Sequence, residues 1–194
     1  MKLSENPFAV LGATTRDDRR RLQELAEERA LTSDEHAVAE ARLVLTNARR
    51  RIAAEVSWLP GLSPSRAADA LALLESDPVA IRWNESVPLL ARTNLLSAAL
   101  VRCGVELSEV ELRAWMLDLA SATDSLNPES ICALVNEDRE VSGFPEVKSI
   151  DEVSARLQDL RANYRRAVWS ALDAQPSEAL VRVLTYVVEQ ATED

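Results

Sequence analysis

His36, the only histidine of the chain, stands beside side chains that a catalytic site would need. Ser33, Asp34 and Glu35 precede it directly, and their types could serve as a nucleophile and its acidic partners. In a catalytic triad, however, the three groups converge on the substrate from separate parts of the chain. Consecutive residues do not converge in this way, so we predict a helix-start or solvated histidine and no catalytic residue.

The remaining reactive side chains are too scattered to bind a metal or a cofactor. Cys103 and Cys132 show no CxxC spacing, and one histidine with two distant cysteines does not supply a tetrahedral metal site. Four glycines in the whole chain do not form a phosphate-binding loop. A magnesium site made of carboxylates alone stays open, although no acidic pair is marked out. We predict two buried thiols, no cofactor, no metal site and no enzyme.

Patterns typical of helices extend over the whole chain. Residues that favour a helix N-cap stand directly before proline in four places, and no stretch alternates apolar and polar residues over the length of a strand. Ser or Thr stands three residues before Asp or Glu at Thr15, Ser108 and Ser149, which predicts capping boxes. The fold class is therefore all-α, with helices expected at about 7–11, 16–31, 36–57, 64–75, 78–83, 88–103, 109–122, 128–140, 150–173 and 177–191.

The net charge of −10 divides the chain into two parts. Residues 1–61 hold 10 Lys+Arg and 10 Asp+Glu, whereas residues 62–194 hold 12 and 22, which gives net charges of 0 and −10. The Leu59-Pro60-Gly61 segment lies at this change, so we predict a helical domain over 1–61 packed on an acidic all-helical bundle over 62–194. We expect Trp58, Trp83, Trp115 and Trp169 to anchor the core.

A regular apolar stripe runs along the helix expected at 150–173. Its members recur at spacings of three and four: Ile150, Val153, Leu157, Leu160, Tyr164, Ala167 and Ala171. Such a stripe is either the buried centre of the acidic bundle or one side of a homodimer. We favour the buried centre, because the helix at 88–103 is apolar on nearly every side and needs neighbours all round.

Two motifs in the first part resemble the J-domain of DnaJ-like co-chaperones. The segment Asn6-Pro7-Phe8-Ala9-Val10-Leu11-Gly12 resembles the opening Y-x-x-LG run of that family. Residues 41–51, which read A-R-L-V-L-T-N-A-R-R-R, resemble its third-helix signature, A-x-x-x-L-S-D-x-x-x-R. The resemblance covers residues 1–61 and implies a helical hairpin whose basic second helix meets an acidic partner surface. In that family the next loop carries His-Pro-Asp, which stimulates a DnaK-type ATPase; residues 32–36 here read Thr-Ser-Asp-Glu-His.

We therefore predict a non-enzymatic protein-interaction adaptor, either a degenerate J-domain-like co-chaperone or a complex-assembly subunit. The resemblance assigns partner binding to residues of the second helix and the loop after it: Arg16, Arg19, Arg20, Arg21, Asp34 and His36. The alternative is an acidic, antitoxin-like inhibitor that masks a basic nucleic-acid-binding protein. An acidic surface repels phosphate, so nucleic acid itself is not an expected partner.

No apolar run reaches the roughly 20 residues that a membrane-spanning helix needs. Residues 1–8 also lack the apolar stretch of a signal peptide. We expect a soluble, cytoplasmic protein that binds a chaperone or a component of a larger assembly and does not bind membranes.

Overall fold

The computed structural model describes residues 3–193, and side chains up to residue 189; within these residues every regular element is a helix. The elements are η1 (Leu3–Glu5), α1 (Pro7–Leu11), α2 (Arg19–Ala30), α3 (Glu35–Thr46), α4 (Ala48–Val56), α5 (Pro64–Ser76), η2 (Pro78–Trp83), α6 (Leu89–Cys103), α7 (Glu109–Asp124), α8 (Pro128–Ser142), α9 (Ile150–Asp173) and α10 (Ser177–Glu193), where η marks a 3-10 helix. The all-α prediction is confirmed.

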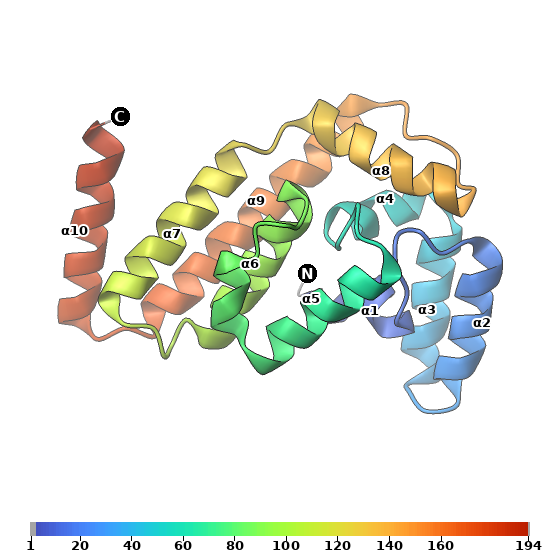
Figure 1. Ribbon diagram of the computed structural model, residues 1–194, viewed down its shortest axis with the longest axis horizontal. Helices are drawn as coiled ribbons and strands as arrows, with labels where there is room; N and C mark the ends of the chain where they lie inside the picture. Colours follow the sequence, from blue (N-terminus) through green and yellow to red (C-terminus); the bar gives the residue numbers. More distant parts are fainter. Residues whose placement is uncertain (1–2, 194) are drawn as a thin grey trace.

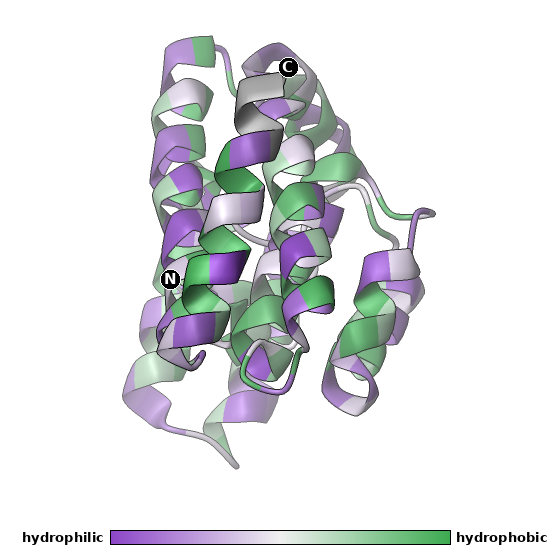
Figure 2. Ribbon diagram, turned by 90° about the vertical axis from the view of Figure 1, so that its left-hand side faces the viewer, coloured by the Kyte–Doolittle hydropathy of each residue, from purple (hydrophilic) through white to green (hydrophobic). Residues whose placement is uncertain are grey.

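The molecule is elongated, with α10 at one end and the antiparallel α2–α3 hairpin at the other (Figure 1). Between them, α6, α7 and α9 pack against one another, and α8 packs on both α9 and α4. Helix α10 lies against α7 and forms the face seen in Figure 2, where hydrophobic residues recur along it. The hairpin is therefore joined to the bundle through α4 and α8.

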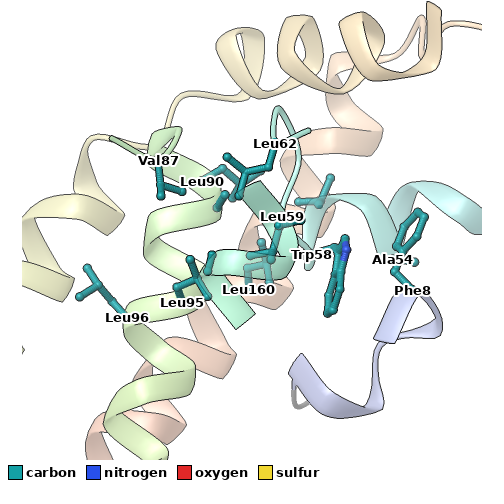
Figure 3. Close-up of a cluster of buried hydrophobic side chains, with 14 of the residues drawn as sticks. Phe8, Ala54, Trp58, Leu59, Leu62, Val87, Leu90, Leu95, Leu96 and Leu160 are labelled. Atoms are coloured by element: carbon teal, nitrogen blue, oxygen red, sulfur yellow. The ribbon is translucent and has the colours of Figure 1, made fainter. Parts of the chain in front are cut away.

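One hydrophobic core continues through both parts of the chain. Phe8 of α1 stacks on Trp58 with their ring centroids 6.2 Å apart, and Leu59 lies next to them on the side of α6 (Figure 3). The buried cluster extends as far as Val183 of α10. The boundary predicted between 61 and 62 lies within this core, and the division into two domains stays a prediction.

The predicted helix starts depend on local hydrogen bonds, and most are present. The side chains of Asn6, Ser63, Asp77 and Asn127 each accept a backbone N–H of the helix that follows, and Ser108 with Glu111 forms a complete capping box. The box predicted at Thr15 is wrong. Helix α2 starts at Arg19, and its cap is Asp18, whose side chain accepts the N–H of Arg21 at 2.7 Å.

The helix expected over 36–57 is two helices, because Asn47 interrupts it. Its backbone is extended, with φ −93° and ψ 113°, and its Oδ1 accepts the N–H groups of Arg49 and Arg50 at 3.0 and 3.1 Å. The side chain of asparagine forms hydrogen bonds with nearby backbone groups more readily than most side chains do, and these bonds replace those of a helix. The break separates the α3 helix, which forms the hairpin, from the α4 helix, which enters the core.

The tryptophans divide into two buried and two exposed residues. Trp58 and Trp115 are core anchors, as predicted, but Trp83 and Trp169 have 71% and 57% of their surface exposed. Trp83 lies at the end of a 3-10 helix, where the Arg82 guanidinium sits over its ring at 4.8 Å. The predictions for Trp83 and Trp169 are wrong. An apolar pattern predicts which face of a helix is buried, but not how far the neighbouring helix extends along that face.

The stripe along α9 lies inside the chain. All of its members except Ile150 are buried, and Tyr164 donates a hydrogen bond to Asn94 of α6 at 2.6 Å. The contacts of α9 with α6, α7 and α8 agree with a buried centre of the bundle. The homodimer through residues 150–173 stays a prediction.

Candidate protein-binding surface

The residues that the sequence proposed for partner binding fall into three separate places. Arg16 and Arg19 turn toward α8, Arg20 and Arg21 lie on the outer side of α2, and Asp34 with His36 lies at the tip of the hairpin. At 1.5 Å per residue, the ten residues from Arg20 to the end of α2 span about 15 Å. The six residues therefore do not form one site.

Arg16 and Arg19 hold the hairpin on the bundle. Arg16 Nε donates to Asp138 Oδ1 of α8 at 2.8 Å, and Asp138 is almost completely buried. The Arg19 guanidinium lies 4.3 Å from the centre of the Phe144 ring, just after α8. Arg16 thus bonds to α8 and Arg19 packs on the ring that follows it, and a role of these two residues in partner binding stays a prediction.

Asp138 is the acceptor at this junction. Its Oδ2 accepts the Thr15 hydroxyl at 2.6 Å and the Gly61 backbone N–H at 2.7 Å, in addition to the Arg16 bond at Oδ1. A buried carboxylate is stable only when its oxygens are paired in this way. Asp138 of α8 thus holds both the segment before α2 and the Leu59-Pro60-Gly61 segment through hydrogen bonds.

A second buried ionic group lies next to it, built from Arg51 and Glu55 of α4 and Arg139 of α8. Arg51 Nε donates to Glu55 Oε1 at 2.6 Å, and Arg139 Nη2 donates to Glu55 Oε2 at 2.7 Å. Burial lowers the pKa of the Arg51 guanidinium, and the Glu55 carboxylate opposes this effect. The Arg51 guanidinium also lies 3.9 Å from the centre of the Phe144 ring. This group fixes α4 against α8.

Three exposed arginines of α3 and α4 make no ion pair with the described residues of the bundle. Arg42 donates to Gln23 of α2 at 2.7 Å, which places the middle of α3 beside the first half of α2. Arg49 and Arg50 follow in the first turn of α4, beyond the break at Asn47, and both are exposed. None of the three forms an ion pair with a carboxylate in the described part of the chain.

Leu43, which follows Arg42 in α3, is also exposed, with 53% of its surface accessible. It is two residues from Ala41 and from Leu45, so it points about 200° away from both buried positions. We call Arg42, Leu43, Arg49 and Arg50 the arginine face. The sequence prediction missed it, although the position of Leu43 opposite the apolar side of α3 was a signal that could have revealed it.

Arg20 and Arg21 border this face but are already paired. Arg20 Nε and Arg21 Nη1 lie 3.0 and 3.3 Å from the Glu24 carboxylate, and their hydrogen bonds lower the pKa of Glu24. Exposed pairs of this kind contribute little to stability and exchange partners easily. These two residues stay candidates for binding, at the edge of the arginine face.

At the tip, Asp34 has a local structural role. Its Oδ1 accepts the backbone N–H of His36 at 3.0 Å and caps α3. His36 and Leu31 are exposed on either side of the loop. Nothing at the tip resembles a His-Pro-Asp arrangement, since the proline is absent from the sequence there.

The part of the chain described here contains no group of three or more His, Cys, Asp or Glu side chains that could hold a metal ion. Cys103 and Cys132 are both buried and free, and burial raises the pKa of the Cys103 thiol. A buried thiol that stays protonated is a weak nucleophile.

In the helices of the described residues, no segment is both long and apolar enough to cross a membrane. Comparison with known proteins adds no relative: no protein-family model, curated protein or solved structure matches the chain.

Proposed function

We propose that the protein is a non-enzymatic adaptor that binds an acidic protein partner through the arginine face of α3 and α4. One observation carries the proposal: Arg42, Arg49 and Arg50 are exposed and have no carboxylate partner among the described residues, and Leu43, next to Arg42 in the chain, is exposed as well. Arginine is favoured at protein interfaces, where its planar fork binds carboxylates through two hydrogen bonds. An apolar contact at the centre of a charged rim is also typical of interfaces.

The buried ionic groups support this function because they make the hairpin rigid. A partner that binds a rigid surface does not have to order it first, and the entropic cost of binding is lower. The side chains of Arg16, Arg51 and Arg139 bond to groups in the interior. The arginines of the arginine face are exposed instead. The partner we propose is a chaperone or a component of a larger assembly.

The experiment is affinity capture from the native cell with two tagged variants. In the first, Arg42, Arg49 and Arg50 are all changed to Glu; in the control, Arg156, Arg165 and Arg166 of α9 are changed to Glu, which alters the net charge equally. Quantitative mass spectrometry should show a partner that is lost only with the first variant. Both variants should keep the helical circular dichroism of the natural chain.

The same experiment addresses the acidic-inhibitor alternative. A basic nuclease or DNA-binding protein that is captured equally by the natural chain and the hairpin variant would contradict the proposed function. Such a partner would dock on acidic residues beyond residue 61. Its affinity would then fall with added salt, because exposed charges are screened over about 10 Å at 0.1 M.

A further inference from the structure

A cavity of about 800 Å³ opens between the N-terminal helices and the bundle. Its lining comes from η1, α1, the end of α2, the segment at Trp58, and helices α5, α6 and α9. Small-molecule sites in proteins typically have volumes of about 300–1,000 Å³. The cavity is therefore large enough for an organic ligand, and the arginine face is not part of its lining.

Much of the cavity wall is apolar and made of small side chains. Alanines from four helices contribute to it, together with two leucines of α5: Ala9, Ala67, Ala98, Ala167, Leu71 and Leu74. Two polar side chains of the wall are hydrogen-bonded within the protein: Tyr164 donates to Asn94 Oδ1, and Asn94 Nδ2 donates to the carbonyl oxygens of Val56 and Trp58. This wall fits the hydrocarbon part of a ligand.

The charged side chains that line the cavity are Arg29, Arg102, Arg166 and Glu75. Three positive charges and one negative charge give +2, in a chain whose net charge is −10. Arg102 forms an ion pair with Glu75, which neutralises both. Arg29 and Arg166 remain without a carboxylate partner in the described residues, so the cavity attracts anions.

Arg29 reaches the cavity beside Gly12. Gly12 ends α1 with φ +68°, and a Cβ atom built there would lie 2.9 Å from Arg29 Nη2. The guanidinium therefore lies close to the glycine backbone. An arginine without a carboxylate partner can bind the carboxylate of a ligand through two parallel hydrogen bonds.

Trp58 closes part of the same wall. It is 2% exposed, and its Nε1–H has no hydrogen-bond partner among the described residues. Because that nitrogen is itself buried, the indole adds apolar surface to the cavity.

From these observations we infer that the cavity binds an anionic amphiphile, namely a single acyl chain with a terminal carboxylate. The hydrocarbon chain lies along the alanine-lined wall, and Arg29 binds the carboxylate. Arg166 adds positive potential without being required for the contact. This is a second site, separate from the proposed protein-binding surface.

Isothermal titration calorimetry of the full chain tests the inference, with dodecanoate, decanoate and dodecanol as probes. Decanoate should bind about 15-fold more weakly than dodecanoate, since each buried CH₂ contributes about 4-fold. Dodecanol, which lacks the charge, should bind at least about 10-fold more weakly. Arg29→Gln should weaken dodecanoate binding by a similar factor, whereas Arg156→Gln on α9 should leave it unchanged.

A pair of cavity-filling variants locates the site. Ala98→Trp fills this cavity and should abolish dodecanoate binding, while Ala120→Trp fills a separate apolar pocket between α7, α9 and α10 and should not. The inference is overturned if dodecanoate gives no binding heat up to about 1 mM, if dodecanol binds equally well, or if only Ala120→Trp removes binding. Arg29 is exposed, so its variant keeps the test valid should Ala98→Trp not fold.

Discussion

Arg139 of α8 and Glu55 of α4 form a two-point ion pair in the interior, although they are 84 residues apart in the chain. Arg139 Nε lies 3.2 Å from Glu55 Oε1, and its Nη2 lies 2.7 Å from Oε2. Arg51 donates to the same carboxylate at 2.6 Å. Two buried arginines thus share one buried glutamate, and this group lies where α4 packs on α8.

Changing this glutamate should therefore destabilise the protein strongly. Glu55→Gln leaves Arg51 and Arg139 without their shared counter-charge, and breaking a buried pair typically costs about 3–5 kcal/mol. Urea unfolding followed by circular dichroism measures the loss. Asp159→Asn, which removes the partner of Arg156 on the surface, is the control and should cost no more than about 1 kcal/mol. Equal effects of the two variants would mean that the buried pair adds nothing.

The side-chain cap that Asn47 forms on α4 should stabilise the protein. Asn47→Ala removes the acceptor of the Arg49 and Arg50 N–H groups, and loss of an N-cap costs about 0.5–2 kcal/mol. Asn47→Asp keeps the acceptor and should be close to the natural chain in the same urea experiment. A fully stable alanine variant would show that α3 and α4 can join into one helix.

Leu157 tests the position of the α9 stripe. It is 1% exposed, so Leu157→Asp places an unpaired carboxylate in the interior at a cost of several kcal/mol. Circular dichroism should show an unfolded or much less stable protein, while Ile150→Asp, at the exposed end of the stripe, should stay folded. A folded Leu157→Asp variant that changes from dimer to monomer on a sizing column would place the stripe in a homodimer interface instead.

The loop at the tip of the hairpin can be tested in an ATPase assay. Added to a DnaK-type ATPase, the protein should give no stimulation, because residues 32–36 lack the His-Pro-Asp tripeptide of the family that it resembles. A complete J-domain serves as the positive control. Stimulation that disappears in Asp34→Ala or His36→Ala would show that this loop works as a variant of the tripeptide.

Cys103 should be protected by its burial. Because burial raises the pKa of its thiol, the native form stays protonated while the unfolded form ionises above its ordinary pKa of 9.0. The contribution to stability is present below pH 9 and is lost as the pH rises further. The difference in urea midpoint between pH 8 and pH 10 should thus be smaller for Cys103→Val than for the natural chain. Identical differences would contradict the pKa shift.

The sequence by itself determined where most helices begin and end. Asn6, Ser63, Asp77 and Asn127 act on backbone groups within three residues of themselves, so the hydrogen bonds they form are visible in the local sequence. The same holds for the inward side of α9, because its apolar spacing repeats with the helical turn. These features need no knowledge of distant contacts.

Only the tertiary structure decided which charged residues are buried and which are exposed. Arg49, Arg50 and Arg51 are adjacent and chemically identical, yet only Arg51 meets Glu55 and α8, because the break at Asn47 sets the rotation of α4. Arg16 likewise turns inward because Asp138 lies opposite it, 122 residues later. Whether a side chain is buried depends on the helix that packs against it, and that helix comes from a distant part of the chain.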